Sequence, residues 1–345
     1  MRHPIRSALA ALLATGTLLL APSVGSAGLS TEVDAGADRP GKPGAEVVPV
    51  GTYVVGRTTQ TFVDDSRPTM AAGTFPGAPN RTLLTTIYYP AQGTPGDAVV
   101  DDARPAKKNG PYPLILFSHG LTANARVYEE MIKSWASAGY VIAAPDYPLS
   151  NTNAPGGNIF LNGLSDTPNQ PADASFVIGE VLDLARAKGT LRGLVDKKHI
   201  GASGHSLGGI TTLGLTYSDC CIDERIDAAA PMSGITEIVA PGGTFFHGVD
   251  TPLLVLHSDR DELVPYSAGV DAFIRASAPK FLVTFVGGTH IQPFVSVDGP
   301  PGEALVATSV AFWDYFLKGD RDGLDRLRDG VPDPSVATLQ EAKAP

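Results

Sequence analysis

Apolar positions in this chain are grouped into short runs that are separated by longer amphipathic segments. Eight runs are rich in β-branched and aromatic residues, as strands are, and they lie at 52–63, 81–90, 112–119, 140–145, 198–205, 226–233, 252–258 and 280–288. The first two runs mix polar with apolar residues, which is typical of half-exposed antiparallel strands. The later six are short and almost continuously apolar, which indicates strands that are covered on both faces.

Helical patterns alternate with the later runs, and they lie at 125–138, 172–188, 207–217, 267–277 and 303–317. A strand followed by a helix, repeated along a chain, forms right-handed crossovers and a parallel sheet. We therefore expect an α/β fold with a mostly parallel eight-stranded sheet and helices on both of its faces.

Two segments do not fit this alternation. Residues 148–171 contain many Gly, Pro and Asn residues, so we expect a long loop that serves as a lid or as a pocket wall. Residues 319–345 begin with charged positions, and we expect a short helix at 323–330 followed by a frayed remainder.

The N-terminal segment has the features of an export signal. Arg2 and Arg6 precede an uncharged apolar run at 8–21, and small residues follow at 25–27, which together indicate a secretory signal peptide over residues 1–27. The apolar run is shorter than the roughly 20 residues that a membrane-spanning helix needs. We expect a secreted, extracellular protein with no membrane span.

The rest of the chain divides into three parts. Residues 28–47 are rich in Gly, Pro and acidic residues and have few large apolar ones, which predicts a disordered lead-in. We expect the folded domain at 48–320 and a C-terminal extension at 321–345.

Charge narrows the possible partners. All 36 acidic residues lie after residue 27 and two of the 26 basic residues lie before it, so the net charge without the signal peptide is 24 − 36, or −12. A chain this acidic is poorly suited to bind nucleic acid, and we expect no nucleic-acid partner. We expect a monomer.

The two cysteines, Cys220 and Cys221, are adjacent in the sequence. Adjacent Cα atoms are about 3.8 Å apart, below the usual disulfide range of roughly 4.4–6.8 Å, so a bond between them would be strained. Three interpretations remain, namely a strained vicinal disulfide, two buried thiols and an intermolecular bridge. None of them indicates a metal site.

Ser206 lies at the centre of a G-x-S-x-G motif, "GHSLG", directly after a predicted strand and directly before a predicted helix. In this context a sharp turn exposes the serine hydroxyl above the sheet edge, and the flanking glycines make room for it. The helix that begins at Leu207 directs free N–H groups toward the same point. The motif predicts a nucleophile, and the alternative is chance spacing in a chain with 38 glycines.

A serine nucleophile needs a base, which in this arrangement follows a late strand. His290, in "VGGTH", lies just past the last predicted strand and before the last long helix. We expect His290 to be the base. If it instead has a structural role at the strand end, His247 and His257 are the substitutes.

The acid that orients the base is expected in "LHSDRDELVP", after the strand at 252–258. We choose Asp261, with Asp259 as the alternative. Asp146 follows the strand at 140–145, which is too early in the chain order, and we expect it to structure a turn.

The oxyanion of an acyl-transfer reaction needs two hydrogen-bond donors. One is expected to be the N–H of Leu207, which follows the nucleophile. The second is expected in "SHGLTAN", where Gly120 allows a close backbone approach and Leu121 presents its N–H. The alternative is that this segment is only a tight turn.

The substrate pocket is expected to draw on Thr122, on Gly120, and on the segments 148–171 and 242–248. The second segment contains Phe245 and Phe246, which would form an apolar site for the acyl or alcohol group. It is equally consistent with the sequence that both are ordinary core aromatics.

The segments "FSHGLTAN", "GHSLGG", "HSDRDELVP" and "GGTH", in this order and spacing, make the chain resemble the α/β-hydrolase superfamily over about residues 50–320. Within it, "TTIYYPA", "SWASAGYVIAAPDYP" and "NQPADASFVIGEVLDL" resemble a branch of bacterial esterases. That branch contains dienelactone-hydrolase-like, chlorophyllase-like and platelet-activating-factor-acetylhydrolase-like enzymes, with cutinase-like polyester hydrolases nearby. In such families the acid precedes x-x-Val-Pro, which implies Asp261.

The resemblance implies a secreted serine hydrolase that cleaves carboxylic esters through an acyl-enzyme, without a cofactor or metal. Ser206 would be the nucleophile, His290 the base and Asp261 the acid, with Leu121 and Leu207 holding the oxyanion. The expected substrate is a small-molecule, lipid or polymeric ester. One alternative is a lipase or cutinase-like polyester hydrolase that acts on insoluble esters. Another is a noncatalytic binding protein on the same fold.

Overall fold

The computed structural model describes residues 51–236 and 243–342. The signal peptide expected at 1–27 and the lead-in expected at 28–47 lie outside the described residues. Within them, no helix is both long and apolar enough to cross a membrane.

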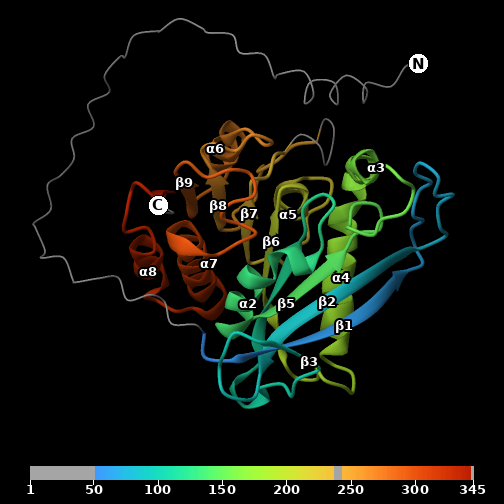
Figure 1. Cartoon of the computed structure of the whole chain (residues 1–345), viewed down its shortest axis with the longest axis horizontal. Coiled ribbons are helices and arrows are strands. Elements are labelled where there is room, and N and C mark those ends of the chain that lie inside the picture. The colour runs from blue at the N-terminus through green and yellow to red at the C-terminus, as the bar shows by residue number, and fades with distance from the viewer. Residues whose placement is uncertain (1–50, 237–242, 343–345) are drawn as a thin grey trace, which may run out of the picture. The chain divides into compact units, whose positions relative to one another are not determined.

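A single mixed sheet of ten strands runs through the described part of the chain, in the order β10-β9-β8-β7-β6-β4-β5-β2-β1-β3 (Figure 1). The strands are β1 (Val54–Asp64), β2 (Arg81–Ala91), β3 (Val99–Asp101), β4 (Tyr112–Ser118), β5 (Val141–Asp146), β6 (Val195–His205), β7 (Ala228–Met232), β8 (Leu253–Ser258), β9 (Lys280–Phe285) and β10 (Ala337–Ala342). The block from β5 through β4 to β9 is parallel, whereas β2 and β10 run antiparallel to their neighbours.

The helices connect these strands and cover both faces of the sheet. The α-helices are α2 (Glu129–Ser137), α3 (Ile159–Asp166), α4 (Gln170–Leu184), α5 (Leu207–Tyr217), α6 (Tyr266–Arg275), α7 (Gly299–Lys318) and α8 (Gly323–Asp329), and short 3-10 turns lie at η1 (Lys107–Asn109), η2 (Ala125–Tyr128) and η3 (Thr167–Asn169). One hydrophobic cluster joins α2 and α7 to the sheet, and two others join α4, α5 and α6 to it.

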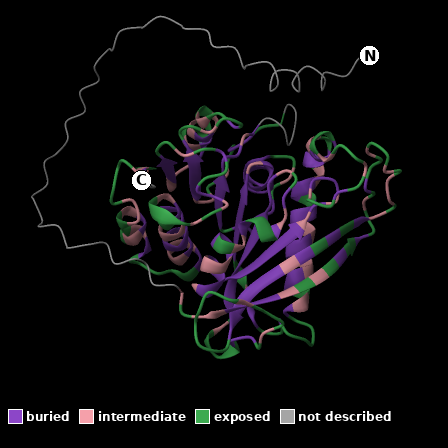
Figure 2. Ribbon diagram, in the orientation of Figure 1, coloured by how far each residue is buried: buried purple, intermediate pink, exposed green. Residues whose placement is uncertain are grey.

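Burial follows the pattern that the sequence predicts. Every residue of β4, β7 and β8 is buried, because helices cover both faces there. In β1 and β2, buried and exposed residues alternate over part of each strand, which Figure 2 shows as changes of colour along the two ribbons. The antiparallel pairing of β1 with β2 matches this half-exposed character.

The expected count of eight strands is wrong, because β3 and β10 were not anticipated. β3 has only three residues, too few for a periodic pattern. β10 reads "ATLQEA" and lacks β-branched and aromatic enrichment, yet it pairs along its whole length with β9. The remainder of the C-terminal segment is therefore not frayed up to residue 342, and the helix expected at 323–330 is α8.

The segment 148–171 is not a continuous loop, since it contains α3 and η3. Asn158 caps α3 by accepting a hydrogen bond from the N–H of Leu161. The helix is held against the sheet by Arg81, which is fully buried and bonds both carboxylate oxygens of Asp166 and of Asp173 at 2.6–3.1 Å. This stabilisation is tertiary, and so a local pattern does not reveal it.

Cys220 and Cys221 form a vicinal disulfide, with their Cα atoms 3.8 Å apart. Of the three interpretations left open by the sequence, the structure contains the first. The pair follows α5, and the Sγ atom of Cys220 lies 3.3 Å from the hydroxyl of Ser218.

Candidate active site

Ser206 occupies a strained turn between β6 and α5. Its φ is 56° and its ψ is −117°, a backbone conformation that non-glycine residues rarely adopt. The N–H of Ser206 donates to the carbonyl of Met232 at 2.9 Å, which fixes the turn to β7. A Cβ atom on Gly208 would lie 1.9 Å from the carbonyl oxygen of Ser118, so the backbones approach too closely for any side chain. Packing around the turn therefore requires a glycine at position 208.

The structure brings together the three side chains singled out by the sequence. The Nε2 atom of His290 lies 2.8 Å from the Oγ atom of Ser206. On the other side of the ring, Nδ1 lies 2.9 and 2.8 Å from the two carboxylate oxygens of Asp261. Because a carboxylate only accepts, Nδ1 carries the proton and Nε2 is free to accept the proton of the serine hydroxyl.

Asp261 is held as an anion by its surroundings. Burial opposes its ionisation, but hydrogen bonds from His257 and His290 and from the N–H of Val264 outweigh this effect and hold its pKa well below the usual range. Its Oδ1 atom accepts from the N–H groups of Leu263 and Val264 at 2.9 and 2.8 Å. A permanent carboxylate is what keeps the proton of His290 on Nδ1.

The side chains of the other acids and histidines that the sequence offers form no hydrogen bond with Ser206 or with the ring of His290 among the described residues. Asp259 is exposed and accepts from the N–H of Gly287 at 2.7 Å, and His247 is exposed as well. The Nε2 atom of His257 lies 3.5 Å from Asp261 and 3.1 Å from the carbonyl of Val264. The carboxylate of Asp146 accepts no hydrogen bond from the described residues, and burial raises its pKa to about 6.

The turn after β4, residues 119–122, contains the second expected oxyanion donor, Leu121, and is called the oxyanion turn below. Among the described residues, neither the N–H of Leu121 nor that of Leu207 has a hydrogen-bond acceptor, as a pair of free donors requires. The N–H of Thr122 is occupied, because it donates to the carbonyl of Ser150 at 2.8 Å. The N–H of Gly120 points inward and donates to the hydroxyl of Tyr128 at 3.1 Å.

The buried side chain of His119 joins this turn to the residue after β5. The Nδ1 atom of His119 bonds the carbonyl of Gly120 at 2.7 Å, and its Nε2 atom accepts from the N–H of Tyr147 at 3.1 Å. These partners define a neutral ring with the proton on Nδ1. Burial lowers the pKa of His119 to about 4, so it stays neutral near pH 7.

Part of the segment 148–171 packs against the oxyanion turn. Thr152 donates its N–H to the carbonyl of Ala123 at 3.0 Å and its hydroxyl to the carbonyl of Thr122 at 3.0 Å. A Cβ atom on Gly163 of α3 would lie 2.4 Å from the side chain of Leu121, so α3 packs directly on the turn.

Phe245 and Phe246 are each 7% exposed and belong to the cluster beneath α5 and α6. The guanidinium of Arg275 lies 5.5 Å from the ring centroid of Phe246. The structure thus favours the alternative reading of both residues as core aromatics over a role in an acyl or alcohol site.

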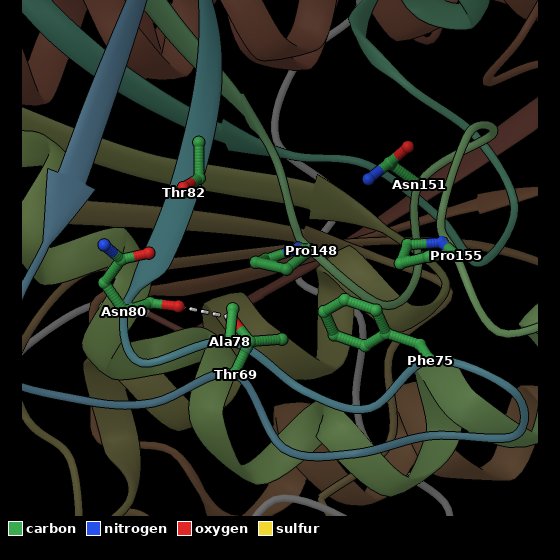
Figure 3. Close-up of a pocket in the computed structure, with 8 residues that line it drawn as sticks. All are labelled: Thr69, Phe75, Ala78, Asn80, Thr82, Pro148, Asn151 and Pro155. Atoms are coloured by element: carbon green, nitrogen blue, oxygen red, sulfur yellow. Dashed lines mark hydrogen bonds between the residues drawn. The ribbon is translucent and has the colours of Figure 1, made fainter.

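A separate cavity of about 230 Å³ lies beside the same segment (Figure 3). Figure 3 shows the ring of Phe75 beside Pro148 and Pro155, and the remaining lining residues are Thr69, Ala78, Asn80, Thr82 and Asn151. None of them belongs to the triad. Asn151 forms a β-bridge with Ala123, so the cavity adjoins the oxyanion turn through this one segment.

Three aromatic side chains at this site were not singled out as functional from the sequence: Tyr128, Tyr147 and Phe294. The motif gives no signal for them, because each reaches the site through tertiary packing. His205 precedes Ser206 in the G-x-S-x-G motif, and this position is a signal that its ring lies near the site.

Comparisons with known proteins agree with this fold. The family described as "Platelet-activating factor acetylhydrolase, isoform II" matches residues 79–150. The chain is 23% identical over 259 residues to a bis(hydroxyethyl) terephthalate hydrolase of Streptomyces coelicolor, covering 74% of this chain and 68% of that protein. It is also 23% identical over 272 residues to cutinase 1 of Thermobifida cellulosilytica, covering 75% of this chain and 83% of that protein.

Among solved structures, a ferulic acid esterase from Streptomyces cinnamoneus is similar with a TM-score of 0.62 and 23% identity. The similarity covers 86% of this chain and 99% of that one. The family model and the sequence relatives confirm the resemblance to a hydrolase branch near the cutinases. The structural similarity shows that the chain has the α/β-hydrolase fold, here with a ten-stranded sheet.

Proposed function

We propose that this protein hydrolyses carboxylic esters with Ser206 as the nucleophile, His290 as the base and Asp261 as the orienting acid. The observation that carries the proposal is the continuous bonding from the hydroxyl of Ser206 through the ring of His290 to Asp261, at 2.8 Å on either side of the ring. This is the arrangement that lets a neutral hydroxyl lose its proton as it attacks.

In the proposed reaction the Oγ atom of Ser206 bonds to the ester carbonyl carbon while its proton passes to Nε2 of His290. The carbonyl oxygen becomes an oxyanion that accepts from the N–H groups of Leu121 and Leu207. The bond to the alcohol oxygen then breaks as His290 returns the proton to it. Water then attacks the carbonyl carbon of the acyl-enzyme while its proton passes to Nε2 of His290. The bond between this carbon and Oγ breaks as His290 returns the proton to Oγ, which releases the acid and restores Ser206.

The names of two of the similar proteins suggest the acyl group. A terephthalate ester and a ferulic acid ester both carry an aromatic acid. We therefore propose aromatic carboxylic esters as the first substrates to test. Thr122, which is exposed on the oxyanion turn, is proposed to contact them, while Gly120 acts through the backbone.

A second candidate is hydrolysis of insoluble esters, as the similarity to cutinases suggests. Phe160 and Leu161 on α3 are 50% and 47% exposed, and α3 packs on Leu121. Exposed apolar side chains beside the site favour contact with an apolar surface.

The test is a panel of soluble p-nitrophenyl esters of increasing acyl length, together with methyl ferulate, bis(hydroxyethyl) terephthalate and a polyester film. Wild type is compared with Ser206→Ala, and both are treated with a fluorophosphonate. We expect turnover and covalent labelling in wild type and neither in the variant. A wild type that binds these esters without turnover would instead support a noncatalytic binding protein.

We also propose that the protein is exported, with cleavage after Ala27 and the folded domain beginning near residue 48. Expression in a secreting host followed by mass spectrometry tests this, and the expected N-terminus is Gly28. An intact N-terminus on protein recovered from the medium would contradict the assignment of residues 1–27.

A further inference from the structure

A chain of three hydrogen bonds runs behind the triad and joins the oxyanion turn to the loop of the base. The N–H of Gly120 lies 3.1 Å from the hydroxyl of Tyr128, and that hydroxyl lies 3.0 Å from Nδ1 of His205. The Nε2 atom of His205 lies 2.7 Å from the main-chain carbonyl of His290. Two segments that are 170 residues apart in sequence are thus connected by two side chains.

The backbone groups at the two ends of this series of hydrogen bonds determine where each proton in it lies. A backbone N–H can only donate, so the hydroxyl of Tyr128 accepts from Gly120 and is free to donate to His205. A carbonyl can only accept, so His205 donates from Nε2 to His290 and its Nδ1 atom is an acceptor. The arrangement is complete only for a neutral His205 with its proton on Nε2.

The surroundings of His205 favour this neutral form. The residue is 1% exposed, and its ring centroid lies 4.7 Å from that of His290 and 4.9 Å from that of Phe294. Burial, with a further contribution from the neighbouring His290, lowers the pKa of His205 to about 3. A positive ring here would lose the bond from Tyr128 and would repel the imidazolium that His290 becomes during the proposed reaction.

The residues that form these hydrogen bonds are closely packed. A Cβ atom on Gly120 would lie 2.7 Å from the hydroxyl of Tyr128, and Tyr128 itself is 2% exposed.

We propose that Tyr128 and His205 are positioning residues that set the distance between the oxyanion donors and the base. The inference rests on the proposed ester hydrolysis. Neither residue touches a reacting atom: Tyr128 acts through the backbone of Gly120, next to the donor at Leu121, and His205 acts through the backbone and ring of His290. Both ends must be correct at once for the transition state, so their separation affects turnover more than substrate binding.

The test compares kcat and KM of Tyr128→Phe, His205→Phe and His205→Gln on a soluble p-nitrophenyl ester. Tyr112→Phe is the matched control, because it also removes one buried tyrosine hydroxyl, which donates to the carbonyl of Ala106 at the opposite end of β4. We expect kcat to fall about 10- to 100-fold in Tyr128→Phe and His205→Phe, with KM within about threefold of wild type. His205→Gln keeps a donor for His290 and should recover part of kcat, and Tyr112→Phe should keep wild-type kcat.

The double variant Tyr128→Phe with His205→Phe adds a second requirement. Because the two side chains act in one chain of bonds, breaking it twice should cost little more than breaking it once, and the effects on kcat should be clearly non-additive. Fully additive effects would contradict a shared role.

Long-range proton–nitrogen NMR reports the charge and the tautomer of the His205 ring without any substrate. At pH 7 we expect His205 in wild type to be neutral with its proton on Nε2, with assignment by comparison with His205→Gln. A charged ring, a proton on Nδ1, or full kcat in Tyr128→Phe would overturn the inference. An inactive wild type would reject the proposed function and the positioning role together, whereas an active wild type with unaffected variants would reject the positioning role alone.

Discussion

Asp261 is surrounded by more donors than one histidine provides. His290, His257 and two backbone N–H groups all approach a carboxylate whose side chain is fully buried. Such a group gains its stabilisation only as an anion, because a proton on it would displace one of these donors. The geometry therefore links the charge of one residue to the tautomer of another.

Replacing Asp261 with Asn should lower kcat by about 10³- to 10⁴-fold, because an amide would favour the wrong tautomer of His290. Asp259→Asn is the matched control, since the carboxylate of Asp259 bonds only the N–H of Gly287 among the described residues and is exposed. Steady-state kinetics on a soluble ester checks both variants. A large loss in Asp259→Asn, with Asp261→Asn unaffected, would reverse the assignment of the acid.

The buried neutral histidines predict how stability depends on pH. The pKa values of His119 and His205 are lowered to about 4 and about 3, so the unfolded chain binds two more protons than the native state below an ordinary value of about 6.5. Asp146, whose pKa is raised to about 6, binds a proton in the native state and opposes this over about pH 4–6. Among these three groups, one net proton remains in favour of the unfolded state between about pH 4 and pH 6. Burial also raises the pKa values of Asp173 and Asp227, which reduces this excess where they bind protons in the native state.

These groups should therefore make the free energy of unfolding fall as pH drops from about 6 to about 4, by at most about 1.4 kcal/mol per pH unit. Urea unfolding at several pH values measures this slope. His205→Gln should flatten it, because one titrating group is lost, and Asp146→Asn should steepen it. A slope of the same size in all three proteins would mean that other groups determine how the free energy of unfolding depends on pH in this range.

The fixed position of α3 depends on one buried ion network rather than on helix propensity. Arg81, at the first position of β2, satisfies the carboxylates of Asp166 at the end of α3 and of Asp173 in α4, and none of the three side chains is more than 1% exposed. Arg67 reaches Asp173 from the surface side at 2.7 Å. The network fixes the segment that packs against the oxyanion turn at both ends of η3.

Arg81→Met should lower the free energy of unfolding by about 3–5 kcal/mol, because it leaves two buried carboxylates without their main partner. Arg186→Met removes an exposed pair with Asp183, whose side chains are 60% and 68% exposed, and should change it by less than about 0.5 kcal/mol. Urea denaturation compares the two. Equal losses would show that the network contributes no more than a surface pair.

The sequence predicts the elements whose signal is local and misses those that depend on distant partners. The helix expected at 207–217 is α5 with the same bounds, because the motif defines its start and the apolar run its length. The helix expected from residue 303 begins at Gly299, since two prolines occupy its first turn. In contrast, α3 needs Arg81, and β10 needs the exposed edge of β9.

The same distinction holds for the candidate site. Ser206, His290 and Asp261 can be located from motif and chain order, and the structure brings them together. The supporting side chains of Tyr128, His205 and His257 cannot, because their role depends on which backbone groups they meet. Phe245 and Phe246 show the converse, since an apolar pair in a loop looks the same in sequence whether it lines a pocket or fills the core.

Parallel strands collect the candidate site from four distant parts of the chain. β4, β6, β8 and β9 all end at the same edge of the sheet, and the oxyanion turn, Ser206, Asp261 and His290 follow these strands in that order. The site is therefore complete only when β9 is in place. β10 is the strand that covers the outer edge of β9.

Deleting residues 337–345 should lower the free energy of unfolding by about 2 kcal/mol or more and promote association, because it exposes the edge of β9 and removes the buried Ala337. Deleting only 343–345 leaves β10 complete and is the control. Urea unfolding and size-exclusion chromatography check both proteins. An unchanged, monodisperse product of the longer deletion would show that β10 is dispensable.

The pairing of the outer strands also determines where the described chain leaves the sheet. Ala342 pairs with Lys280, the first residue of β9, and Val54 pairs with Ala91, the last residue of β2. Since β2 is antiparallel to β5, both positions lie at the edge opposite Ser206. A carrier or solid support attached at either position would hold the molecule with the Ser206 side of the sheet facing the solution, so immobilisation there should leave the candidate site accessible.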